Sequence, residues 1–182
     1  MKPRHHVVIT GTGRTGSTFL VELLTHLGLD TGYAVSDLAH HKSDAARAGL
    51  EHDVRNMDCP YIVKSPFFCD YASSVVSQPN IVIDHVFIPI RDLGAAAESR
   101  RYVSNAMAEG SSILRRLLNC RGRRWRKGVA GGLHGTTSSV PGQQESVLLD
   151  KIYRLLFVLS DTEVAVTLIR YPRLVKDSQY LY

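Results

Sequence analysis

The sequence contains few cysteines and no long apolar run. Its three cysteines, Cys59, Cys69 and Cys120, are an odd number without metal-ligand spacing. We therefore expect reduced thiols, with neither a disulfide framework nor a zinc site. No stretch approaches the roughly 20 apolar residues that a membrane-spanning helix needs. The apolar run VVIT near the N-terminus stops after four residues, which predicts no secretory leader and a cytoplasmic protein.

Acidic residues are missing from the most basic part of the chain. Hydrophobic residues make up 44% and charged residues 21% of the 182 residues, with a formal net charge of +5. This balance is typical of one folded domain spanning residues 1–182. Between Arg115 and Lys127 lie seven basic residues and no acid, which indicates either a polyanion-binding segment or a solvated loop. With Trp125 as its only aromatic residue, the segment does not resemble a nucleic-acid surface, and no nucleic-acid partner is expected.

Short β-branched runs alternate with amphipathic stretches along the chain, which predicts an α/β fold, a three-layer sandwich around a mostly parallel sheet. The predicted strands are 6–10, 61–64, 83–90 and 164–170. The predicted helices are 15–27, one around 44–50, 93–108, 144–159 and one starting near 172. Residues 119–143, rich in Gly, Arg, Ser and Thr, are predicted to form a long mobile loop.

The turn after the first predicted strand has the composition of an anion site. Glycines at positions 11, 13 and 16 separate an apolar strand from an amphipathic helix. Backbone N–H groups and the positive end of the helix can surround an anion there if no side chain blocks the approach. Ser17 and Thr18 add hydroxyl donors and Arg14 adds a forked cation. The turn, Lys64 and Arg91 all fall at carboxyl ends of predicted parallel strands, where such sheets bind ligands.

Two common nucleotide-binding motifs match this turn only in part. A nucleoside-triphosphate P-loop needs a lysine where Ser17 stands, which disfavours ATP or GTP hydrolysis but leaves a kinase or other nucleotide-dependent enzyme as an alternative. GTGRTG also fits the G-x-G-x-x-G of an NAD(P)-binding Rossmann-type oxidoreductase. That motif needs an acid about 20 residues on, at the end of a second strand. Asp30 and Asp37 lie nearby, but the residues around them form no convincing strand.

The stretch GTGRTGSTFLVELL resembles the phosphosulfate-binding loop of the sulfotransferase superfamily, commonly written Pro-Lys/Arg-Ser-Gly-Thr-Thr. The matching residues are Gly13 (at the usual proline), Arg14, Thr15, Gly16, Ser17 and Thr18. The resemblance implies a P-loop NTPase-like fold, with 3′-phosphoadenosine-5′-phosphosulfate (PAPS) as donor and adenosine 3′,5′-bisphosphate (PAP) as product. Arg14 would neutralise charge on the bridging oxygen as the sulfuryl group leaves.

A second motif of that superfamily lies at the third predicted strand. In HVFIPIRDLGAAAESRRYVS, Arg91 ends the strand and Ser99 follows eight residues later on the next helix. In sulfotransferases such a pair holds the 3′-phosphate of the cofactor. YIVKSPFF resembles the strand ending Lys-Thr-His, so Lys64 would steady the transferred group, whereas Pro66 replaces the catalytic histidine. Tyr171 in LIRYPRLVKD matches a further, weaker motif.

The resemblance implies transfer of a sulfuryl group to a hydroxyl or amine of a small-molecule or carbohydrate acceptor, without a metal. Positioning and charge neutralisation would provide most of the catalysis. Because Pro66 replaces the histidine, the acceptor's base must come from elsewhere, or the chain is a non-catalytic nucleotide-binding relative. The candidate bases lie between the turn and the second strand: Asp37, His40, His41, Glu51 and His52.

Overall fold

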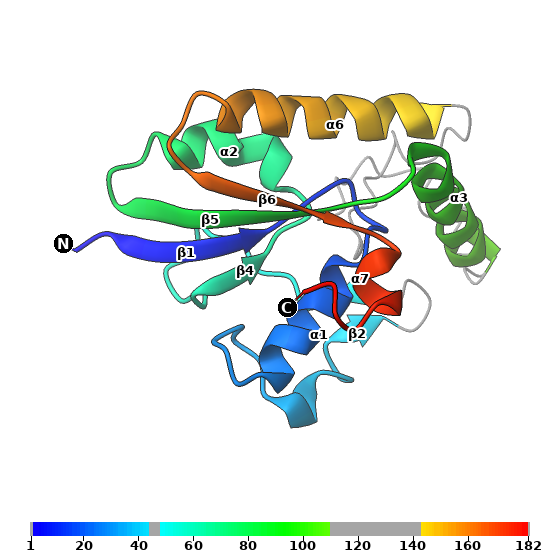
Figure 1. Ribbon diagram of the computed structural model, residues 1–182, viewed down its shortest axis with the longest axis horizontal. Helices are drawn as coiled ribbons and strands as arrows, with labels where there is room; N and C mark the ends of the chain where they lie inside the picture. The colour runs from blue at the N-terminus through cyan, green and yellow to red at the C-terminus, as the bar shows by residue number, and fades with distance from the viewer. Residues whose placement is uncertain (1, 44–47, 110–142, 182) are drawn as a thin grey trace, which may run out of the picture.

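The computed structural model describes residues 2–43, 48–109 and 143–181. An all-parallel sheet forms its centre, with the strand order β4 (Ile62–Lys64), β1 (Arg4–Ile9), β5 (Ile81–Ile90) and β6 (Ala165–Arg170) (Figure 1). β1 pairs with both β4 and β5, and β5 pairs with β6. The predicted α/β class is therefore confirmed, with helices flanking four parallel strands.

Helices cover both faces of the sheet (Figure 1). α2 (Phe68–Val76) and α6 (Gln144–Leu159) lie on one face. α1 (Ser17–His26) and the short α7 (Arg173–Lys176) lie on the other. α3 (Leu93–Glu109) follows β5 and packs against α6. The layers place the turn between β1 and α1 at the carboxyl edge of the sheet, as expected for parallel strands.

Alternate residues of β1 fill the two cores. Val8 packs with Phe68 of α2 and Leu155 of α6 in one buried cluster. The next residue, Ile9, packs with Leu20 of α1 and with α7 in the other. Because neighbouring side chains of a strand point to opposite faces and both faces are covered, the strand must be apolar throughout. That requirement explains the uninterrupted run VVI.

The segment around residue 48 differs from the sequence prediction. A helix over 44–50 was expected, but Ala48–Gly49 form β3, paired antiparallel with β2 (Lys42–Ser43). The prediction is wrong at these positions because the two backbones approach too closely for a helix. A Cβ atom added to Gly49 would clash with the His41 carbonyl oxygen. Residues 44–47 lie outside the described ranges.

Other differences are smaller. α2 was not predicted, although its buried residues Phe68, Cys69, Ala72 and Val75 follow helical spacing. The basic segment and most of the predicted loop at 119–143 lie outside the described ranges, as does Cys120. Cys59 and Cys69 are free thiols. In the described ranges, no His, Cys, Asp or Glu cluster suits a metal ion. No helix there is long and apolar enough to cross a membrane.

The burial of two histidine side chains, His6 and His52, predicts that the fold loses stability at acidic pH. His6 is buried beside the Pro60 carbonyl oxygen, 2.8 Å from its Nδ1, and burial lowers its pKa below the usual 6.5. Burial also lowers the pKa of His52. As pH falls through about 6.5, the unfolded chain takes up these protons first, so we expect the free energy of unfolding to decrease. Urea titrations between about pH 7.5 and 5.5, above the carboxylate range, measure this.

His6→Asn should make that decrease shallower, because the buried imidazole is gone and a donor for Pro60 remains. The matched control is His26→Asn, which removes an exposed imidazole at the end of α1. A free energy of unfolding that stays flat over this pH interval, or an equal effect of both variants, would contradict the assignment.

Candidate phosphate-binding site

The turn between β1 and α1 has a backbone shaped for close approach. Gly13, Arg14 and Gly16 have φ values of 77°, 62° and 91°. Arg14 is one of two non-glycine residues with positive φ in the described ranges; such strain is typical of functional sites. Gly16 caps α1, and within the described residues no side chain caps this end and no acid lies in its first turn. The positive end of α1 is therefore available to an anion.

Gly16 is also held by the C-terminal part of the chain. A Cβ atom added there would lie 2.9 Å from Cδ2 of Tyr171 and 3.3 Å from Leu174 of α7. Leu174 is buried together with Leu20 of α1. The turn is thus fixed between the sheet and α7, and glycine is required by both its backbone angle and its surroundings.

Arginines from two elements meet the turn. Arg14 Nε donates to Ser99 Oγ of α3 at 3.1 Å. Arg91, directly after β5, donates from Nη1 to the Arg14 carbonyl oxygen at 3.3 Å. Its guanidinium lies over the Tyr171 ring, 5.0 Å from the centroid. The two members of the predicted 3′-phosphate pair therefore both contact Arg14.

A third arginine, Arg100 of α3, hydrogen-bonds the turn from the protein interior, and no sequence motif indicated it. Arg100 is fully buried and donates from Nη1 to the Thr12 carbonyl oxygen at 3.2 Å. Its Nε donates to Oε1 of Gln144, also buried, at 2.9 Å. Burial, with a smaller contribution from the charge of Arg14, lowers the pKa of Arg100 to about 10. Its position four residues after Ala96 and three after Ala97 was a usable signal, because these residues share the buried face of α3.

Lys64, at the end of β4, is buried and uses its ammonium group within the protein. Its Nζ donates to Thr18 Oγ1 at 3.0 Å and to the Gly49 carbonyl oxygen at 2.5 Å. Glu51 Oε1 lies 3.3 Å from the same nitrogen. Burial lowers the pKa of Lys64, while Glu51 opposes that shift. The ammonium therefore links the turn to the segment containing Glu51.

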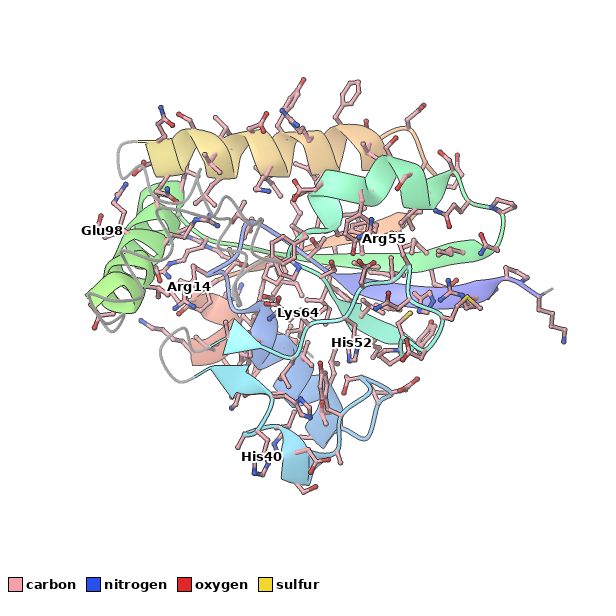
Figure 2. The ribbon with its side chains drawn as sticks, turned by 180° about the vertical axis from the view of Figure 1, so that it is seen from behind. Arg14, His40, His52, Arg55, Lys64 and Glu98 are labelled. Carbon is pink, nitrogen blue, oxygen red and sulfur yellow. The ribbon has the colours of Figure 1, made fainter. Side chains whose placement is uncertain are left out.

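These side chains surround a cavity of about 680 Å³ at the carboxyl edge of the sheet. In Figure 2 the labelled Lys64 lies near the middle of the molecule and Arg14 lies toward α3, whereas His40 lies at the lower end. Eight of the nine predicted site residues line this cavity: Gly13, Arg14, Gly16, Ser17, Thr18, Lys64, Arg91 and Ser99. The ninth, Thr15, is buried, and its Oγ1 has no hydrogen-bond partner among the described residues.

The five predicted bases do not line the cavity. Glu51 contacts the lining residue Lys64, with its Oε1 3.3 Å from Nζ. His52 packs against the Tyr33 ring, with centroids 4.9 Å apart. The lining instead includes Glu22, one turn after Thr18 on α1, whose carboxylate pairs with Lys42. Glu22 was missed because its role depends on the position of β2, which no motif revealed.

Comparisons of the chain with protein-family models, curated proteins and solved structures found no match. The geometry of the cavity and the motif resemblance therefore provide the basis for a function.

Gly16→Ala tests the tight packing of the turn. An alanine there combines an unfavourable φ of 91° with the clash against Tyr171, so we expect a loss of about 2–4 kcal/mol in the free energy of unfolding. Gly28→Ala is the matched control, because Gly28 has φ 78° but no atom within 4 Å of an added Cβ. Gly28→Ala should lower the free energy of unfolding only by the cost of the left-handed backbone angle, about 1–2 kcal/mol. Equal losses in urea denaturation would show that α7 does not hold the turn.

Proposed function

We propose that the chain is a sulfotransferase that binds PAPS in this cavity and acts on a small-molecule or carbohydrate acceptor. The observation that supports this most is that Arg91 and Ser99 line the same cavity as the Gly13–Thr18 turn. One ligand with two phosphate-bearing ends would contact both. The volume falls in the roughly 300–1,000 Å³ range of small-molecule sites. The free thiols of Cys59 and Cys69 support a reducing, cytoplasmic location.

The residues present fit such a ligand. The glycine at position 16 leaves space that a Cβ would fill, and the first turn of α1 directs backbone N–H groups outward. Arg14 and Arg91 supply forked donors suited to phosphate and sulfate oxygens. We place the 5′-phosphosulfate at the turn and the 3′-phosphate at Arg91 and Ser99. When bound, PAPS supplies the sulfuryl group and a bisphosphate leaving group.

Charge neutralisation by fixed donors would provide most of the catalysis. Arg14 and the N-terminal N–H groups of α1 stabilise negative charge that develops on the leaving phosphate. Thr18 is oriented by its hydrogen bond from Lys64. Because Lys64 already contacts Thr18, Gly49 and Glu51, it acts directly on the sulfuryl group only by exchanging one of these contacts; otherwise it positions Thr18.

Glu22 is the best-placed group to accept the acceptor's proton. It is the one carboxylate among the described residues that line the cavity, and it lies one helical turn from Thr18. In the transfer step the acceptor oxygen or nitrogen forms a bond to sulfur, the bond from sulfur to the bridging oxygen breaks, and Glu22 takes the proton. The ion pair with Lys42 fixes its orientation.

The alternative function, an NAD(P)-binding Rossmann-type oxidoreductase, has less support from the geometry. Its acid would have to lie at the carboxyl edge of the sheet. Asp30 instead accepts a hydrogen bond from the Tyr61 N–H at 2.9 Å, just before β4 begins. It therefore lies at the opposite edge from the cavity. The strand next to β1 ends in Lys64, a cation, where a ribose-binding acid would be needed.

PAP should raise the melting temperature of the protein. A ligand at about 100 times its dissociation constant stabilises the folded state by roughly 2.7 kcal/mol, which corresponds to about 5–10 °C for a domain of this size. Arg91→Ala should weaken binding roughly 10- to 100-fold, because it removes a charge-assisted contact to phosphate. Calorimetric titration with PAP, adenosine 5′-phosphate and NADP measures this.

Arg154→Ala is the control, since it removes an equal charge from the exposed face of α6. It should leave PAP binding unchanged. A preference for NADP over PAP would support the oxidoreductase, and magnesium-dependent ATP binding would support a kinase. Equal PAP affinity in Arg91→Ala and the unmodified chain would remove the basis of the proposal.

Glu22→Gln should lower sulfuryl transfer by about 10²- to 10⁴-fold, the usual contribution of a positioned base. PAP binding should change little, because the base faces the acceptor. Transfer from labelled PAPS to a panel of sugars, phenols and amines measures the rate. Asp37→Asn, an exposed position away from the cavity, is the control. Tight PAP binding by the unmodified chain without transfer to any acceptor would support a non-catalytic relative.

A further inference from the structure

The strand β6 leaves one edge of the sheet open. It pairs with β5 on one side, and the described residues place no strand on its other side. Five of its six residues are exposed, including the large apolar Val166 and Leu168. Strands of a parallel sheet are normally covered on both faces. An exposed apolar edge is a ready template for pairing with another strand.

Val166 and Leu168 lie on the same face of the sheet as α6. In the pairing of β6 with β5 they align with Val86 and Ile88. Both of those residues belong to the core formed with α2 and α6. Ile169, between Leu168 and Arg170, belongs to the opposite core with α1 and α7. The exposed side chains of Val166 and Leu168 therefore lie on the face of the sheet that α6 covers, at its unpaired edge.

The exposed apolar side of α6 continues this surface. Lys151 pairs with Asp70 of α2 at 2.9 Å, which fixes the flank of α6 that faces α2. On the opposite flank lie Leu149 and Leu156, which are 56% and 39% exposed. Tyr153 and Phe157 lie about half a turn from the buried Leu148 and Leu155, so their rings face away from the sheet. The combined surface, called the β6 surface below, consists of Leu149, Leu156, Val166 and Leu168.

The backbone of β6 has donors directed at the open edge. The Arg170 N–H donates to the Tyr180 hydroxyl at 3.0 Å, so this group points away from β5. Because N–H directions alternate along a strand, those of Leu168 and Val166 point the same way. Tyr180 covers the end of the edge and leaves the two middle positions open.

We propose that the β6 surface binds a second copy of this chain, with the two β6 strands antiparallel about a two-fold axis at Thr167. In this register Val166 of one copy lies opposite Leu168 of the other. Both have outward N–H and C=O groups, so they form the hydrogen-bonded pairs that an antiparallel ladder requires. The interface is self-complementary, as two-fold symmetry demands.

Charge favours a second copy in this orientation. β6 begins two residues after Glu163 and ends at Arg170. Both side chains are exposed, and neither forms an ion pair within the described residues. Antiparallel pairing brings the Glu163 end of one copy next to the Arg170 end of the other, twice in the dimer. Parallel pairing would instead place like charges together.

The two α6 helices would then lie on the same face of a continuous eight-stranded sheet. Each α6 packs over β5, whose Val86 and Ile88 belong to its core, so the exposed Val166 and Leu168 side chains of both copies would fill the space between the two helices. A stable interface buries roughly 800 Å² per partner. Two short strand edges supply less than that, so the apolar flank of α6 is needed in the same contact.

The mass of the full chain in sedimentation velocity, from about 1 to 100 µM, tests this proposal. The unmodified 20.2 kDa chain should form dimers. Leu168→Lys should weaken the dimer at least about tenfold, because it places a cation against the partner's apolar side chains. Leu29→Lys is the matched control, since Leu29 is 47% and Leu168 51% exposed. The circular dichroism spectrum and melting curve at low concentration should match for both, which separates weaker pairing from misfolding.

A charge exchange tests the orientation. Glu163→Arg alone should weaken the dimer, and adding Arg170→Glu should restore it. Hydrogen exchange at high concentration should protect the N–H groups of Val166 and Leu168, whereas the Arg170 N–H, bound to Tyr180, should be protected at every concentration. A monomer at the highest concentration, an open-ended polymer, or a dimer that survives Leu168→Lys would overturn the proposal.

Discussion

The rest of the site depends on cations gathered around one strained turn. Arg14 adopts a left-handed conformation, Arg91 binds its carbonyl oxygen, and Arg100 is buried beneath Thr12. Like charges at this distance repel, and the effect is visible in the pKa of Arg100, which Arg14 helps to lower. Collecting such charges costs free energy in the unliganded protein. An anion bound at the turn would offset that cost, so ligand binding and folding stability are coupled here.

The two kinds of cation in the site have different tasks. The Lys64 ammonium, a compact group on a flexible stem, is enclosed by Thr18, Gly49 and Glu51 and holds the turn against β3. The arginines present planar forks that can contact the turn and still offer further donors. Electrostatic catalysis of group transfer needs donors that do not reorganise during the reaction. Arginines held by the Ser99 hydroxyl and by backbone carbonyl oxygens meet that need better than a lysine whose donors already bind protein groups.

The sequence predicted those parts of the fold that depend on local pattern. The alternation of strands and helices was sufficient for the parallel sheet, and chain position alone brought Lys64 and Arg91 to the same edge. The segment before β4 could not be predicted, because its structure follows from a close backbone contact at Gly49 rather than from periodicity. For the same reason the predicted bases were placed away from the cavity while Glu22 was overlooked. Its position in the lining depends on Lys42, which is distant in sequence.

β6 connects the open edge of the sheet with the cavity. Its last residue, Arg170, is followed by Tyr171, which lies against Gly16 and beneath the guanidinium of Arg91. An edge strand has a hydrogen-bonded neighbour on one side only, so fewer contacts restrain it than a central strand. Pairing of β6 with a second copy would restrain Tyr171 and, through it, both the turn and Arg91. Association at the apolar edge would thus reduce the conformational freedom that a ligand at the proposed anion site must otherwise remove.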